Sequence, residues 1–262
     1  MNPELPNRSA WDIRLREVAV RLGGHQVLRE VNLDVPGGQL VAIIGPSGAG
    51  KTTILKLLNG SVSCTRGTAQ VGGQEVGSLR GESLRRLRRG IGFIHQDLRL
   101  VPNLRVSQNV LSGKLGAQNL LQSVRMFLRP AGADLNEAHS LLERVGIPEK
   151  LFQRTDSLSG GQAQRVAVAR ALIQKPHLLL ADEPVASVDP ARAREVLALL
   201  VEICRQDGLT LCVSLHTPGL VREFFDRVIG LRDGQVVLDV PAGDLTDDQL
   251  AAIYALEGSG GV

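Results

Sequence analysis

Apolar residues gather in short runs along this chain, and glycine or proline separates most of the runs. Residues 15–20 and 27–35 alternate or bunch apolar residues around Gly23-Gly24, a pattern that predicts short strands joined by tight turns. The apolar residues 39–44 are followed by a glycine-rich loop, and residues 52–58 then have helical spacing. The chain is therefore predicted to open with an antiparallel sheet and to continue as strand, loop and helix.

The later part of the chain contains a long helical stretch between two regions that carry strands. Residues 91–94 predict a buried strand, whereas residues 97–157 have helical patterns at 106–115, 120–128 and 136–145. From residue 159 onward helices and strands alternate: the pattern predicts a helix at 159–173, a strand at 177–181, a helix at 191–205 and a strand at 210–214. A hairpin-like pair of strands at 228–232 and 235–240 follows, and then a short acidic tail helix. Strands that alternate with helices form parallel sheets covered on both faces. The pattern therefore predicts an α/β fold with an inserted helical subdomain.

The composition is that of an ordinary globular protein. Of the 262 residues, 43% are hydrophobic and 22% are charged, which excludes a disordered or collagen-like chain. No apolar run approaches the roughly 20 residues that a membrane helix needs. The N-terminus carries Glu4 and Asp12 and has no hydrophobic segment, so it does not resemble a secretory signal. We therefore expect the protein in the cytoplasm.

Charge and cysteine content narrow the possible partners. The formal net charge is +3, and five arginines lie within residues 80–89, which form either a solvated helix face or a contact for nucleic-acid or lipid phosphates. One Trp, one Tyr and five Phe are too few for the stacking platforms of single-strand binders, so no nucleic-acid partner is expected. Cys64, Cys204 and Cys212 form no CxxC pair, which argues against a disulfide framework or a zinc site.

The glycine-rich loop matches the phosphate-binding P-loop. It reads Gly45-Pro46-Ser47-Gly48-Ala49-Gly50-Lys51-Thr52, and Thr53 follows as part of the predicted site. Glycines let successive backbone N–H groups point at a polyphosphate, and the helix that begins near Lys51 adds its positive end. We expect Lys51 to reach the β- and γ-phosphates of a nucleotide and the Thr52 hydroxyl to bind Mg²⁺. The alternative is a glycine-rich turn in a parallel-sheet protein.

Two carboxylates follow the predicted strand at 177–181. Ligands gather at this edge of open parallel sheets, so Asp182 and Glu183 are candidates for phosphate chemistry. We expect Asp182 to hold magnesium through its water shell and Glu183 to polarise the water that attacks the γ-phosphate. A lone acidic pair at a helix N-terminus has the same pattern, so the assignment depends on the P-loop.

A second glycine-containing motif opens the helix that begins near residue 159. It reads Leu158-Ser159-Gly160-Gly161-Gln162, in which Ser159 is a good helix cap and the glycines expose backbone N–H groups. With this motif the chain resembles the ATP-binding subunits of ABC transporters over nearly all of residues 13–240. The resemblance implies that the LSGGQ helix of one subunit closes on the γ-phosphate held by the P-loop of another. Two ATP molecules then lie in a head-to-tail dimer, and one chain carries half of each site.

The resemblance also implies a domain organisation. It predicts a P-loop NTPase (RecA-like) core with a small antiparallel β subdomain, formed by residues 13–96 and 158–240. The helical subdomain is residues 97–157, the N-terminal extension is residues 1–12, and the tail helix lies within residues 241–262.

Three further residues acquire roles only through the resemblance. Gln96 is similar to the glutamine that contacts Mg²⁺ and the attacking water, and the helical insertion that touches the membrane partner begins there. Ser187-Val188-Asp189 occupies the loop that crosses the dimer interface, with Asp189 as the matching residue. His216 stands where the family has a histidine that senses the γ-phosphate. Taken alone, Gln96 has the pattern of a surface glutamine and His216 that of a structural histidine.

One position departs from the family pattern. An aromatic residue that stacks on adenine normally precedes the turn at Gly23, and this chain has Leu22 there. Leucine packs on a ring without stacking, a difference worth about 1–3 kcal/mol per base. We therefore expect weaker ATP binding or looser base selectivity.

Details of the chain narrow the group within the family. One P-loop and one LSGGQ exclude two-cassette ATPases and indicate a subunit that serves a separate permease. Residues 109–116, 214–216 and 245–254 look like the corresponding segments of phosphonate importers. The resemblance implies ATP hydrolysis coupled to import of phosphonate, phosphite or a related oxyanion. The implied partners are a second copy, permease subunits and, indirectly, an extracytoplasmic binding protein, with this chain at the cytoplasmic face of the inner membrane. Transport of amino acids, metals or lipoproteins and a soluble nucleic-acid-linked ATPase remain alternatives.

Overall fold

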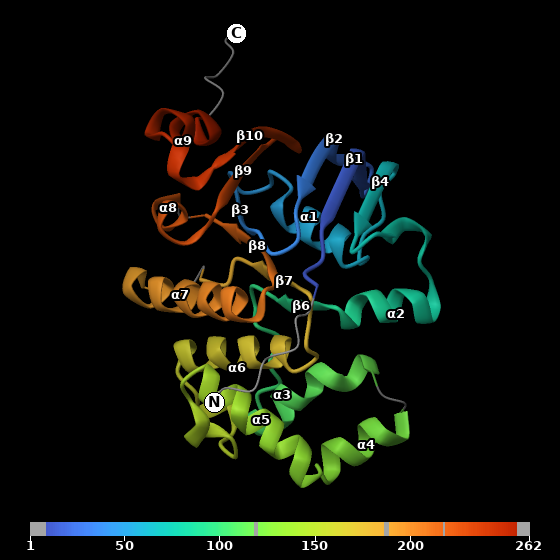
Figure 1. The fold of residues 1–262 in the computed structure, drawn as a ribbon, viewed down its shortest axis with the longest axis vertical. Helices are drawn as coiled ribbons and strands as arrows, with labels where there is room; N and C mark the ends of the chain where they lie inside the picture. Colours follow the sequence, from blue (N-terminus) through green and yellow to red (C-terminus); the bar gives the residue numbers. More distant parts are fainter. Residues whose placement is uncertain (1–8, 118–119, 186–188, 217, 256–262) are drawn as a thin grey trace.

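The computed structural model describes residues 9–117, 120–185, 189–216 and 218–255, which contain two β-sheets (Figure 1). The first sheet has the order β2-β1-β4-β5 and is antiparallel, with β1 Ile13–Leu22, β2 His25–Val35, β4 Arg66–Val71 and β5 Gln74–Glu75. The second has the order β10-β9-β3-β8-β7-β6, with β3 Leu40–Ile44, β6 Ile91–Ile94, β7 Leu178–Asp182, β8 Thr210–Leu215, β9 Arg227–Arg232 and β10 Gln235–Pro241.

The second sheet is parallel from β9 to β6, and only β10 runs antiparallel to its neighbour. Its strand β3 leads directly into the P-loop and pairs with β8, and β7 pairs with the other edge of β8, with Asp182 opposite Ser214. The carboxyl ends of three buried parallel strands therefore meet at one edge, which is where ligands bind in open α/β sheets.

The helices lie on both sides of this sheet and in a separate group below it (Figure 1). Helices α1 Lys51–Leu58, α2 Gly81–Arg89, α7 Pro190–Asp207, α8 Val221–Phe224 and α9 Asp247–Tyr254 accompany the sheets. Helices α3 Val106–Leu111, α4 Leu120–Leu128 and α5 Gly132–Arg144 lie between β6 and β7 in the chain and next to α6 Gly160–Leu172 in space. Among the described helices, none combines the length and the apolar character needed to cross a membrane.

Alternate residues of the central strands enter two different hydrophobic cores. Leu40, Ala42 and Ile44 of β3 pack into a core with α6 and α7, whereas Val41 and Ile43 pack into a core with α1 and the antiparallel sheet. Each fully buried leucine, isoleucine or valine contributes about 1.5–3 kcal/mol of hydrophobic stabilisation. The sheet is therefore held from both faces, and the predicted α/β fold is confirmed. The domain boundaries stay a prediction.

Some elements differ from the expectations drawn from the sequence. Strand β4 was not predicted, because only Ala69 and Val71 are buried in it and its pairing with β1 supplies the rest. The helix predicted at 106–115 ends at Leu111 and continues as a 3-10 helix, Ser112–Ala117. A Cβ at Gly113 would lie 2.2 Å from the carbonyl oxygen of Arg170, so this turn approaches α6 very closely.

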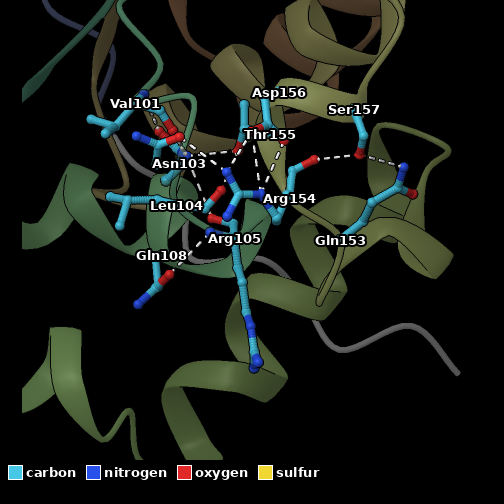
Figure 2. A network of polar contacts seen from close by, with 11 residues as sticks. Val101, Asn103, Leu104, Arg105, Gln108, Gln153, Arg154, Thr155, Asp156 and Ser157 are labelled. Carbon is cyan, nitrogen blue, oxygen red and sulfur yellow. Dashed lines mark hydrogen bonds and ion pairs between the residues drawn. The ribbon is translucent and has the colours of Figure 1, made fainter.

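A polar network fixes the loop before α3 to the loop before α6 (Figure 2). Asn109 is 1% exposed; its side chain donates to Thr155 Oγ1 over 2.8 Å and accepts from the Val101 N–H over 2.8 Å. The Thr155 N–H donates to the Leu104 carbonyl over 3.0 Å, and Arg154 pairs with Asp156. Because buried polar groups that lose a partner are costly, this network holds the segment leading into the LSGGQ helix in one position.

Candidate nucleotide-binding site

The loop between β3 and α1 has a backbone that requires glycine at particular positions. Gly45 has φ 150°, and a Cβ there would lie 2.1 Å from the Leu231 carbonyl oxygen. Gly50 has φ 105°, and a Cβ there would lie 2.6 Å from Leu28 Cδ2. Helix α1 begins at the next residue, so its free N–H groups and the positive end of its dipole face the loop. The geometry is that of an anion-binding site.

Lys51 is buried at the start of α1 and points back across the loop. Its side chain is 4% exposed, and Nζ donates to the carbonyl oxygens of Gly45 over 2.8 Å and Pro46 over 3.0 Å. Nζ also lies 3.9 Å from Oε1 of Glu183. Burial lowers the pKa of Lys51, and the nearby Glu183 and Asp182 carboxylates oppose that effect. This desolvated cation has neutral carbonyl partners that a phosphate can replace.

Asp182 lies at the end of β7 and accepts hydrogen bonds from two hydroxyl groups. Thr52 Oγ1 donates to Asp182 Oδ1 over 2.9 Å, and Ser214 Oγ donates to the same oxygen over 2.8 Å. Ser214 also accepts from the Glu183 N–H over 2.9 Å. Hydroxyl and carboxylate oxygens are hard ligands of the kind that Mg²⁺ takes, usually with water and substrate phosphates. Thr52 and Asp182 therefore fit the predicted magnesium site.

Glu183 and His216 meet at the carboxyl ends of β7 and β8. Glu183 is buried, has φ 47°, and its Oε1 forms an ion pair with His216 Nε2. A positive φ is uncommon for a residue other than glycine and is often found at functional sites. The contact with Lys51 and this one with His216 occupy the Glu183 carboxylate in the structure.

One cavity of about 330 Å³ gathers most of these groups. It is lined by Val27, Ser47, Gly48, Gly50, Lys51, Thr52, Thr53, Gln96, Glu183 and His216. A neighbouring hollow shares Thr52 and Gln96 with it and also contacts Asp182. Residues predicted from four separate segments therefore lie around one space that is wide enough for a polyphosphate.

The LSGGQ segment lies elsewhere. Ser159 caps α6: its Oγ accepts from the Gln162 N–H over 3.3 Å, and Gln162 Oε1 accepts from the Ser159 N–H over 3.0 Å. Ser159 and Gly160 are exposed, and Gly161 and Gln162 are partly so. Within the described part of the chain, no residue of this motif lines the P-loop cavity, and Figure 1 shows α6 and α1 on different sides of the sheet.

The predicted residues Asp189 and Leu22 also lie outside the lining of the cavity, as do Gly45, Pro46 and Ala49 of the loop itself, and Asp182 contacts only the neighbouring hollow. Asp189 caps α7, where its Oδ1 accepts from the Arg192 N–H over 3.1 Å, while Ser187 and Val188 fall outside the described residues. Leu22 is 42% exposed at the end of β1, and of the described apolar residues Val27 on β2 lines the cavity in its place.

Two residues near the site received no role from the sequence. Ser214 is a polar residue at the end of a buried strand, and its position beside Asp182 follows once the strand order is known. Tyr254 Oη accepts from the Gly45 N–H over 3.2 Å and donates to the His216 carbonyl oxygen over 3.4 Å. No local pattern connects Tyr254 with the P-loop, because it lies 209 positions after Gly45 in the sequence.

Comparison with known proteins gives the family. Residues 28–186, more than half of the chain, match the family described as ABC transporter. The phosphonates import ATP-binding protein PhnC 1 of Rhodopseudomonas palustris is 45% identical over 89% of this chain and 83% of its own length. PhnC 2 of Oceanobacillus iheyensis, with the same description, is 43% identical over 90% of this chain and 92% of its own length.

A solved structure has the same fold. The ATP-binding cassette MJ0796, solved as a dimer in a post-hydrolysis state bound to ADP and Pi, is 31% identical, with a TM-score of 0.75 over 88% of this chain and 98% of that one. The resemblance inferred from the P-loop and LSGGQ motifs is confirmed, and this chain belongs to the ABC transporter family.

Proposed function

We propose that this chain is the subunit that binds and hydrolyses ATP to power an importer of phosphonates or related oxyanions. The observation that carries the proposal is a single cavity in which Lys51, Glu183 and His216 meet at the edge of a parallel sheet. Phosphoryl transfer to water uses a cation that binds the phosphate and a carboxylate that activates the water, here with an imidazole beside it.

ATP with Mg²⁺ fits the donor set of the cavity. The N–H groups at the start of α1 and the Lys51 ammonium would hold the phosphates, and Thr52, Asp182 and Gln96 would hold the metal. When bound, Mg²⁺ neutralises charge on the phosphates. The carbonyl oxygens of Gly45 and Pro46 are weaker partners for Lys51 than a phosphate, so ligand binding would draw its ammonium into the cavity.

Glu183 would act as the general base toward water. A phosphate that attracts the Lys51 ammonium and the His216 side chain would remove both contacts from the Glu183 carboxylate, which could then accept a proton from water. The Ser214 hydroxyl accepts from the backbone N–H of Glu183 and donates to Oδ1 of Asp182, so it positions both residues. These contacts order the water-activating group and the metal ligand with respect to each other.

A second copy of the chain would complete the site. The LSGGQ segment is exposed and lies outside the P-loop cavity of its own chain, which leaves its helix N-terminus available to a partner. The related cassette MJ0796 was solved as a dimer bound to ADP and Pi, which supports a dimer here, and the exposed start of α6 favours a head-to-tail one. In such a dimer Ser159 and Gly161 would face the γ-phosphate of the other copy, and Asp189 would lie at the interface.

The cargo is proposed from the relatives. Two proteins that are 43–45% identical over about nine-tenths of this chain are named for phosphonate import. We infer that the chain acts peripherally at the cytoplasmic face of the inner membrane, bound to separate permease subunits. An extracytoplasmic binding protein would deliver the oxyanion, so the cargo itself would not contact this chain.

Uptake of phosphonate and phosphite tests the proposal. Cells that lack the chain, or carry Glu183→Gln, are expected to lose uptake, whereas cells with Glu202→Gln, a matched change on the exposed face of α7, are expected to keep it. If cells without the chain keep phosphonate uptake but lose uptake of amino acids or metals, or release of lipoproteins, the proposed cargo is wrong. ATP hydrolysis that DNA or RNA stimulates without a membrane partner would reject the transport function.

A further inference from the structure

We propose that Tyr254 is a positioning residue of the nucleotide site, which connects the first glycine of the P-loop to the backbone of His216. The inference rests on the proposed function, because it concerns how the phosphate-binding and γ-phosphate-facing segments move together. Its basis is one hydroxyl group that contacts both segments. Tyr254 accepts from the Gly45 N–H over 3.2 Å and donates to the His216 carbonyl oxygen over 3.4 Å.

The phenol completes a closed chain of polar contacts. The N–H of Gly45 donates to the Tyr254 hydroxyl, and the carbonyl oxygen of Gly45 accepts from Lys51 Nζ over 2.8 Å. Lys51 Nζ lies 3.9 Å from Glu183 Oε1, and Glu183 pairs with the His216 side chain. The carbonyl oxygen of His216 accepts a hydrogen bond from the Tyr254 hydroxyl, which closes the chain of contacts. The two hydrogen bonds of Tyr254 share one hydroxyl and polarise each other, and the charged Lys51–Glu183 contact at 3.9 Å connects the other side of the loop.

The tail helix is docked in a way that holds the phenol in place. Ile253 is 3% exposed, and a Cβ at Gly230 on β9 would lie 2.6 Å from its Cδ1. Arg232 donates to the Ala252 carbonyl over 2.9 Å. Helix α9 therefore sits directly on the strand beside β3, and Tyr254 at its end reaches the point where β3 becomes the P-loop.

The two contacts of Tyr254 lie on segments that the nucleotide would use differently. Gly45 begins the loop that would surround the phosphates, whereas His216 lines the cavity beside Glu183, where the proposed function places the γ-phosphate. A ligand that draws Lys51 and His216 toward its terminal phosphate shifts both ends of the bridge. Tyr254 therefore fixes the distance between the P-loop and His216, and its loss affects hydrolysis more than the binding of a nucleoside diphosphate.

Tyr254→Phe removes the hydroxyl and keeps the ring. We expect kcat for ATP hydrolysis to fall about threefold to tenfold, as the loss of one or two ordinary hydrogen bonds predicts, with ADP affinity changed by less than about twofold. The matched control is Asp247→Asn, which removes the negative charge that pairs with Arg222 at the other end of α9. This control is expected to keep the activity of the wild type.

Tyr254 is the one tyrosine in the sequence, so it supplies its own spectroscopic signal. In full-length protein labelled with ¹³Cζ-tyrosine, Mg²⁺–ATP added to the Glu183→Gln variant is expected to shift the single resonance more than ADP does. Because this experiment keeps Tyr254 in place, it tests the positioning role even if Tyr254→Phe unfolds.

The outcomes separate the two proposals. Wild-type kcat in Tyr254→Phe, an equal loss in Asp247→Asn, or a tyrosine resonance that does not respond to ATP overturns the role of Tyr254. A wild-type chain that binds no ATP contradicts the proposed function instead. A selective fall in kcat together with an ATP-dependent resonance supports the positioning role.

Discussion

The hydroxyl of Thr52 donates to Oδ1 of Asp182 over 2.9 Å, which joins the first turn of α1 to the end of β7. Ser214 donates to the same oxygen from β8, so two hydroxyls converge on one carboxylate oxygen. The two proposed metal ligands are thus adjacent and joined by a hydrogen bond. Such preorganisation lowers the cost of assembling a metal site.

Ser214→Ala is expected to weaken Mg²⁺-dependent ATP hydrolysis. The change removes one donor from Asp182 and one acceptor from the Glu183 N–H, which should lower the free energy of unfolding by about 1–3 kcal/mol. The Mg²⁺ concentration for half-maximal hydrolysis should rise about tenfold, as for other residues that orient metal ligands. Ser214→Thr keeps a hydroxyl and is the control. A Mg²⁺ titration of Ser214→Ala that matches the wild type would contradict the assignment.

Glu183→Gln is expected to bind Mg²⁺–ATP and form a dimer without turnover. An amide does not accept a proton from water, so hydrolysis should fall by about 100-fold or more. Light scattering after gel filtration with ATP measures the dimer, and phosphate release measures turnover. Glu202→Gln should behave as the wild type; rapid hydrolysis by Glu183→Gln would remove Glu183 from the role of base.

Leu22→Tyr is expected to tighten ATP binding. An aromatic ring at the end of β1 would stack on adenine, and stacking contributes about 1–3 kcal/mol per base, or about fivefold or more in affinity. Titration of ATP and GTP gives the affinity and the base preference. Leu121→Tyr, at an 81% exposed position of α4, controls for added aromatic surface. Equal affinities for wild type and Leu22→Tyr would show that the adenine lies elsewhere.

The sequence predicted the parts of the site that depend on local backbone geometry. A loop that needs glycine at Gly45 and Gly50 is visible as a motif, and so are the carboxylates that end a buried strand. Contacts between distant segments were not visible. Ser214 meets Asp182 only because β8 lies between β3 and β7, and Tyr254 meets Gly45 only after α9 docks on β9. Strand β4 was missed for the same reason, since β1 determines its pairing.

His95 is expected to make stability depend on pH in the acid range. Burial, together with the positive charges of Arg99 and Arg170, lowers the pKa of His95 from 6.5 to about 4. Between these values the unfolded chain binds a proton that the folded chain does not, so stability falls as the pH drops from 6.5 to 4. Because His95 is partly exposed, solvent screening limits the loss to about 1–2 kcal/mol.

Urea unfolding at pH 7.5 and pH 4.5 measures this effect. His95→Gln should lose less stability than the wild type over that interval, because glutamine does not titrate. His139→Gln, at an exposed position of α5, should lose as much as the wild type. Identical pH dependence in His95→Gln and the wild type would assign the acid sensitivity to other groups.

The LSGGQ segment at the start of α6 lies outside the P-loop cavity of its own chain. For the proposed dimer, this separation makes ATP hydrolysis by free chains second order in protein, so the rate rises with the square of concentration until dimers predominate. Two cassettes tethered to one permease meet at a local concentration far above that of free chains. On this proposal, consumption of ATP would follow the number of assembled transporters, and unassembled copies would hydrolyse little.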